Sequence, residues 1–210
     1  VSFASNGHDG FEQKESLMRE KYKRRDFDVL YMRNRNNWYI GGIRGIGTNI
    51  QHTLAFLRKE FLRYDKIITT GFSAGGYASM LFGSLLGVSD AIVIEGQTDL
   101  NYVVDKQKSW TPETVSFSMS ANGWLQKSEL NRRKQECPVT WEKFHDIRPV
   151  LNTDVRYHFF KRSDKDLSHP YDLIAHGDYH YDLIKDFPTV TKYPTNNPLG
   201  KLIECLDCIG

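Results

Sequence analysis

Short apolar runs alternate with longer stretches in which apolar residues recur at helical spacing. The runs are rich in β-branched and aromatic residues, which is typical of buried strands. We predict strands over residues 1–5, 27–32, 66–70, 91–95, 155–160 and 171–175, and helices over residues 12–25, 50–64 and 74–86. Strands that alternate with helices form a mostly parallel central sheet with helices on both faces, so the pattern predicts an α/β fold.

One apolar run ends in Gly-x-Ser-x-Gly at 71–75 and passes directly into small and apolar residues that favour a helix. A serine on so tight a turn has strained backbone angles, and side chains two positions away would collide with the strand or helix, so both flanks require glycine. The first amides of the helix, starting at Ala74, point to where a tetrahedral oxyanion would form. The stretch predicts a nucleophile elbow with Ser73 at its apex; the alternative is a structural turn.

Two later segments have no clear period. Residues 101–150 carry tryptophans, prolines and basic residues, and we interpret them as a lid or cap inserted over the site, or as irregular surface helices. The tail after Phe187 is richer in Pro, Thr and Asn and is predicted to be peripheral as far as Leu202. With 210 residues the chain fits a single domain, 1–210. Its first apolar run starts at Val1 itself, which is consistent with a piece of a longer protein.

Composition excludes several classes of protein. The net charge of +2 is too close to balance to favour nucleic acid, and 40% hydrophobic with 26% charged residues is typical of a globular protein. We expect no membrane span and no secretion signal, and therefore a cytoplasmic location. Three cysteines do not suggest a disulfide framework, and Cys205 with Cys208 lacks the second pair of a zinc site.

With its elbow and its late aspartates and histidines, the chain resembles the α/β-hydrolase superfamily, in a trimmed form without the first two strands of the full fold. In that superfamily the triad comes in the order Ser, then Asp or Glu, then His. The resemblance implies that the acid follows the strand after the lid segment and that the histidine follows the last strand. Asp164 or Asp166 and His176 or His180 occupy those places.

The distance of each candidate from its strand end favours one histidine and one aspartate, because a residue farther along the loop can extend toward Ser73. His180 lies beyond the expected strand end at 175, where a loop can bend toward Ser73, so we favour it over His176 as the base. Asp166 is farther from its strand than Asp164 and is the favoured acid. Two carboxylates after the preceding strand stay open as the acid: Glu95 and Asp99.

Two loops complete the predicted site. The loop after the first strand would supply a second oxyanion amide, with Asn6, Gly7 and His8 as candidates beside the amide of Ala74. Trp38 and Tyr39 precede paired glycines, and they either shape the mouth of a substrate pocket or pack into the core.

The pattern as a whole predicts a serine esterase that acts through a Ser-His-Asp triad, with no cofactor and no metal. The loop at Trp38 and the elbow also resemble hydrolase-like proteins that accompany bacterial surface-glycan glycosyltransferases. That resemblance implies a carbohydrate-linked ester as the substrate, with small-molecule esters as the broader class. The alternatives are an acyltransferase with the same triad and a non-catalytic binding module in glycan synthesis.

Overall fold

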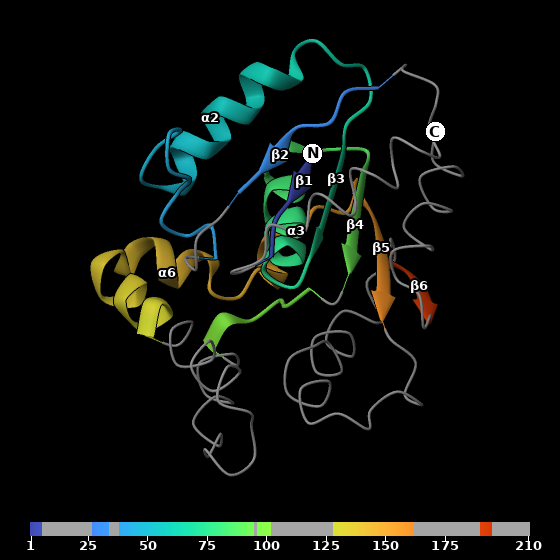
Figure 1. Ribbon diagram of the computed structural model, residues 1–210. Helices are drawn as coiled ribbons and strands as arrows, with labels where there is room; N and C mark the ends of the chain where they lie inside the picture. Colours follow the sequence, from blue (N-terminus) through green and yellow to red (C-terminus); the bar gives the residue numbers. More distant parts are fainter. Residues whose placement is uncertain (6–26, 34–37, 95, 102–127, 162–189, 195–210) are drawn as a thin grey trace.

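A six-stranded parallel sheet forms the centre of the protein (Figure 1). The computed structural model describes residues 1–5, 27–33, 38–94, 96–101, 128–161 and 190–194, and only the backbone of 160–161 and 190–194. The strands are β1 (Ser2–Phe3), β2 (Tyr31–Met32), β3 (Ile68–Phe72), β4 (Asp90–Ile94), β5 (Arg156–Lys161) and β6 (Val190–Pro194). Their order across the sheet is β2-β1-β3-β4-β5-β6. The predicted α/β fold with a parallel sheet is confirmed.

The strand order creates a switch point between β1 and β3. From β1 the chain goes to β2 on one side, and from β2 it returns to β3 on the other side of β1. Ligands of open α/β sheets bind outside the carboxyl ends of the strands at such a point. The arrowheads of β4, β5 and β6 point to one common edge in Figure 1, and the parallel pairing places the carboxyl ends of β1 and β3 at this edge too.

Two helices cover one face of the sheet. α2 (Ile50–Phe61) is capped as predicted by Asn49, whose side chain accepts a hydrogen bond from the His52 amide at 2.9 Å. α3 (Ala74–Leu86) is buried along most of its length and contacts β1, β3, β4 and α2. The helix predicted over residues 12–25 lies outside the described residues. In the part of the chain that the structure describes, no helix has the length and apolar character needed to cross a bilayer.

The described half of the predicted lid segment packs into the core. Residues 128–136 are helical and are followed by α6 (Pro138–Phe144) and the short 3₁₀ helix η2 (Arg148–Val150). The buried side chains that this half contributes are Leu130, Trp141, Phe144 and Ile147. The Tyr77 hydroxyl of α3 donates to the Phe144 carbonyl at 2.7 Å and so ties α6 to α3. Because residues 102–127 lie outside the described residues, the lid interpretation stays a prediction.

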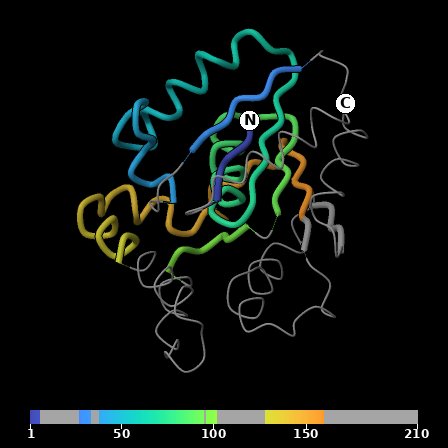
Figure 2. Tube along the Cα trace, in the orientation of Figure 1, coloured from blue at the N-terminus to red at the C-terminus, as the bar shows by residue number. Residues whose placement is uncertain are grey.

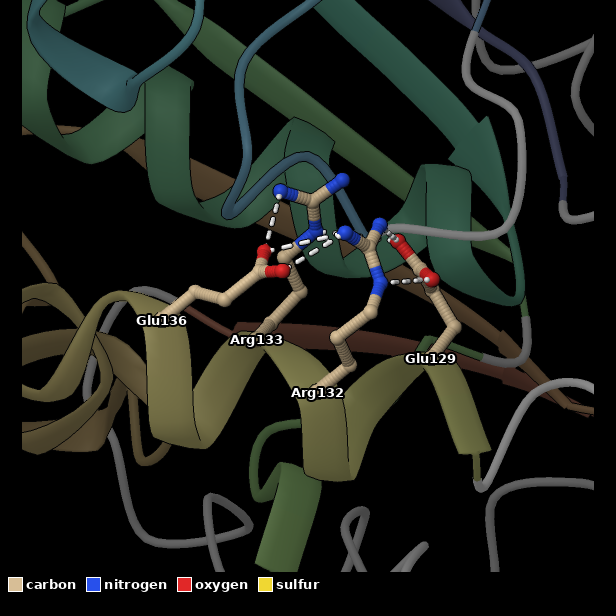
Figure 3. A network of polar contacts seen from close by, with 4 residues as sticks. All are labelled: Glu129, Arg132, Arg133 and Glu136. Carbon is tan, nitrogen blue, oxygen red and sulfur yellow. Dashed lines mark hydrogen bonds and ion pairs between the residues drawn. The ribbon is translucent and has the colours of Figure 1, made fainter.

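A network of ion pairs on the helix of residues 128–136 covers the loop before α2. Figure 3 shows Arg132 and Arg133 between Glu129 and Glu136, with the closest contact at 2.7 Å between Arg132 and Glu129. The guanidinium of Arg133 fills the space beside Gly41, where a β-carbon would lie 2.6 Å from its Cζ atom. Exposed ion pairs each stabilise by about 0.2–1 kcal/mol, and the stem of Arg133, whose pair with Glu129 is partly buried, also contributes packing over Gly41.

The prediction that the tail after Phe187 is peripheral is wrong for residues 190–194, which form a strand of the sheet. β6 pairs with β5 along its length, from Tyr157 opposite Val190 to Lys161 opposite Pro194. The segment has β-branched and aromatic residues, but its flanking Pro and polar residues made it look like a loop, and an edge strand tolerates proline at its end. The strand predicted over 171–175 lies outside the described residues. His176 and His180 therefore precede the last described strand and do not follow it.

Candidate active site

Ser73 is the one residue between β3 and α3. Its backbone angles, φ 54° and ψ −116°, are far from the regions that non-glycine residues normally occupy, at a cost of about 1–3 kcal/mol. The Ser73 amide donates to the Ile94 carbonyl of β4 at 2.9 Å, and its carbonyl accepts from the Tyr77 amide at 3.0 Å. The predicted strand, tight turn and helix are confirmed, and the backbone of the serine is held from both sides.

The two flanking glycines are required by close backbone contacts, as predicted. A β-carbon on Gly71 would lie 2.1 Å from the carbonyl oxygen of Gly75, and a β-carbon on Gly75 would lie 2.2 Å from the carbonyl oxygen of Phe3. Gly75 therefore brings the first turn of α3 against the carboxyl end of β1. Ser73 itself is 8% exposed, and it lies at the switch point of the sheet.

The first turn of α3 offers hydrogen-bond donors next to this serine. The first amides of an α-helix have no acceptor within the helix, and the positive end of the helix dipole lies there. The Ser73 side chain does not cap α3, and the Ser73 amide is already bound to β4. Ala74 is the first residue of the helix and follows Ser73 directly, where the predicted oxyanion donor would be.

Both aromatic residues that were candidates for the pocket mouth are buried. Trp38 is 2% exposed and Tyr39 is fully buried, and both have left-handed backbone angles, φ 49° and φ 66°. Trp38 packs edge-on against Tyr77 at 6.3 Å between ring centroids, and Tyr39 packs edge-on against Phe3 at 5.4 Å. These contacts fit the packing alternative, and contact of either side chain with a substrate stays a prediction.

Other members of the predicted site lie outside the described residues: Asn6, Gly7, His8, Glu95, Asp164, Asp166, His176 and His180. Their roles as oxyanion donors, acid and base therefore stay predictions. Of the predicted catalytic set the structure places Ser73 and Ala74 together. β5, which precedes the candidate acids in the chain, runs parallel to β4 and β3, so its carboxyl end lies at the same edge of the sheet as Ser73.

A cluster at the carboxyl end of β4 brings Asp99 next to His145, a residue that the sequence pattern did not single out. Residues 96–101 leave β4 and run beside the segment after α6, where Asp99 and Asp146 form a bridge (Figure 2). Nδ1 of His145 lies 3.7 Å from the Asp99 carboxylate and 2.9 Å from the Asn101 amide nitrogen. An amide nitrogen can only donate, so this contact is a hydrogen bond when the ring is neutral and carries its proton on Nε2.

Arg148 adds positive charge to this cluster. Its guanidinium pairs with the Asp146 carboxylate and lies 3.9 Å from Asp99. Burial by itself raises the pKa of Asp146, but the hydrogen bonds from Arg148 outweigh it and lower the pKa below 3.8. Asp99, one of the alternative acids, thus lies between a histidine and an arginine. Only three-dimensional contact reveals this, because His145 is distant in sequence and belongs to no motif.

Comparisons with known proteins give weak likenesses of overall fold. No protein-family model and no curated protein sequence matches the chain. One similar structure is the Glycosylation Associate Protein (Gap123) complex from Streptococcus agalactiae, with 14% identity and a TM-score of 0.46 over 99% of this chain and 39% of that chain. Another is the apoenzyme of S-formylglutathione hydrolase (FrmB) from Staphylococcus aureus, with 10% identity and a TM-score of 0.48 over 99% of this chain and 80% of that one. The chain thus spans about two fifths of the length of the first structure, and both likenesses concern the overall fold alone.

Proposed function

We propose that the protein is a serine hydrolase of the esterase type, with Ser73 as its nucleophile. The observation that carries the proposal is the strained backbone of Ser73, a non-glycine residue at φ 54° between a strand and the uncapped start of a helix. Strain of this kind persists only where the surrounding structure enforces it, and it gathers at functional sites. A turn that served structure alone would favour glycine at this position.

The chemistry would proceed in two steps. The Ser73 hydroxyl oxygen attacks the ester carbonyl while His180 takes its proton, and Asp166 orients the imidazole and stabilises its charged form. The Ala74 amide, with an amide from the loop of Asn6 and Gly7, stabilises the oxyanion. The tetrahedral intermediate then expels the alcohol, which receives the proton from the histidine. Water attacks the acyl-enzyme in the same way and releases the acid.

For the substrate we propose an ester, with a carbohydrate-linked ester as the narrower class. Support for the narrower class is the resemblance of the loop at Trp38 and of the elbow to hydrolase-like proteins of glycan synthesis. An acyltransferase would use the same nucleophile and differ only in the acceptor. Adding sugar alcohols to the assay separates the two, because a transferase passes the acyl group to the sugar in place of water.

Covalent labelling tests the proposal directly. A fluorophosphonate probe should modify the wild-type protein at Ser73, located by peptide mass spectrometry, and Ser73→Ala should remove the label. Ser89→Ala is the matched control, because the Ser89 hydroxyl donates to the Ile67 carbonyl at 2.7 Å, before β3 and away from the carboxyl edge. Wild-type protein that stays unlabelled would favour a non-catalytic binding module. His180→Ala and His176→Ala then show which histidine the labelling rate requires.

A further inference from the structure

The Tyr39 hydroxyl joins the ends of two strands at the edge of the sheet where Ser73 lies. It donates to the Ala4 carbonyl at 2.8 Å and also lies 3.1 Å from the Met32 carbonyl. Met32 is the last residue of β2, Ala4 directly follows β1, and the Ala4 amide donates to the Met32 carbonyl at 2.9 Å. The hydroxyl thus adds to the last backbone hydrogen bond between β1 and β2 and contacts the carbonyls of both strand ends.

The surroundings of Tyr39 hold this hydroxyl in place. The ring is fully buried and packs edge-on against Phe3 and Phe82, with centroids 5.4 and 6.3 Å away. Burial raises the pKa of Tyr39 well above 10, so the hydroxyl keeps its proton and remains a donor at all ordinary pH values. Tyr39 and Trp38 adopt left-handed backbone angles in succession, φ 66° and φ 49°, which residues other than glycine rarely adopt. The fold accepts this strain to place the two side chains.

Both side chains of this strained pair reach groups that flank the serine. The Ala4 carbonyl, which Tyr39 binds, would be 3.0 Å from a β-carbon on Gly75 in the first turn of α3. Trp38 packs against Tyr77, whose amide binds the Ser73 carbonyl. The loop after β2 therefore contacts two segments that border the serine turn, the end of β1 and the first turn of α3.

We propose that Tyr39 is a positioning residue, whose hydroxyl fixes the carboxyl end of β1 against the first turn of α3 and so sets the geometry around Ser73. This inference rests on the proposed role of Ser73 as the nucleophile. Without the hydroxyl, the buried Ala4 carbonyl loses its donor, and the backbone at the end of β1 can move relative to Gly75. A displacement of about 1 Å costs up to 10²-fold in rate when reacting groups must be aligned.

The test compares Tyr39→Phe with Tyr157→Phe. The Tyr157 hydroxyl is a matched control, since it is buried and bound to Ser84 Oγ at 2.7 Å and to the Asn152 amide at 3.0 Å, near the amino end of β5. Both variants lose a buried hydroxyl, and urea unfolding measures what each loss costs in stability. The rate constant for fluorophosphonate labelling of Ser73 and amide hydrogen exchange in residues 1–5 and 73–77 are then measured on folded protein.

We expect labelling of Tyr39→Phe to slow about tenfold or more, with faster exchange in both segments, while Tyr157→Phe labels within about twofold of wild type. With p-nitrophenyl acetate as substrate, kcat should fall and KM should stay nearly constant. If Tyr39→Phe labels as fast as Tyr157→Phe, the inference is overturned and the nucleophile stands. Wild-type protein that does not label overturns the proposed function, and this inference with it.

Discussion

The carbonyl oxygen of Gly75 occupies the space that a side chain on Gly71 would need, 2.1 Å from the position of its β-carbon. The end of β3 and the first turn of α3 are therefore in direct backbone contact. Because this contact leaves room for one residue between strand and helix, Ser73 has to make the whole turn alone. Its unusual backbone angles follow from the two glycines that flank it.

Replacing Gly71 with alanine should lower the free energy of unfolding by about 3 kcal/mol or more, since the clash is with backbone that cannot rotate away. Gly45→Ala is the control, because Gly45 has φ 89° but nothing within 4 Å of its β-carbon position. It should cost only the strain of a left-handed alanine, about 1–2 kcal/mol. Urea unfolding checks both values. Equal losses for the two variants would show that the elbow tolerates a side chain at 71.

Ser73→Gly and Ser73→Ala should both abolish labelling, but they should differ in stability. Glycine readily adopts φ 54° and ψ −116°, whereas alanine keeps the strain that serine has. After the greater flexibility of glycine in the unfolded chain is subtracted, Ser73→Gly should be about 1 kcal/mol more stable than Ser73→Ala. The midpoints of urea unfolding measure the difference. A glycine variant no more stable than the alanine variant would mean that the turn is not strained.

Tyr77→Phe should loosen α6 from α3. Its hydroxyl donates to the buried Phe144 carbonyl at 2.7 Å, and a buried carbonyl without its donor costs about 1–3 kcal/mol. Tyr64→Phe is the matched control on the surface, where the hydroxyl binds Asp28, and it should change stability by less than about 0.5 kcal/mol. Limited proteolysis within residues 137–150 should be faster in Tyr77→Phe alone. Equal proteolysis of both variants would contradict the link between the helices.

The parts of the fold that depend on local chemistry were predictable from the sequence. The cap at Asn49 and the strand, turn and helix around Ser73 depend on neighbouring residues, so motif and spacing carry them. β4 was found from its run of apolar residues, which is typical of a strand buried on both faces. β6 was missed because an edge strand needs no such run.

Contacts between distant segments had no signal in the sequence. Nothing near Tyr39 indicates that its hydroxyl binds the end of β1, and nothing near His145 indicates its contact with Asp99. The sequence left two interpretations open for Trp38 and Tyr39, because the sequence pattern of a buried aromatic residue does not differ from that of one that binds a ligand. The contacts of the candidate acid and base with Ser73 likewise have no signal in the sequence. For the base, the labelling rates of His176→Ala and His180→Ala are the test.

The amino ends of β4 and β5 hold a buried charge that should govern stability in acid. Asp90 is fully buried, and its carboxylate accepts from Nε2 of His158 at 2.9 Å and from Arg156 at 2.8 Å. Burial by itself raises the pKa of Asp90, but the hydrogen bonds from His158 and Arg156 and the charge of Arg156 outweigh it and lower the pKa below 3.8. Arg156 is largely exposed, so most of the stabilisation comes from the buried contact with His158.

Asp90→Asn should therefore destabilise the protein by about 1–3 kcal/mol at neutral pH, since it removes an ionised acceptor from a buried pair. Because the pKa of Asp90 is lower in the folded state, the unfolded chain takes up the proton first as the pH falls. The stabilisation is thus present above about pH 4 and is lost as the pH falls through the folded pKa. Urea unfolding of both proteins between pH 7 and pH 3 should show the difference shrinking below pH 4. Asp154→Asn, at an exposed position before β5, should follow the wild-type curve within about 0.5 kcal/mol. A constant difference across this range would mean that Asp90 has the same pKa in the folded and the unfolded state.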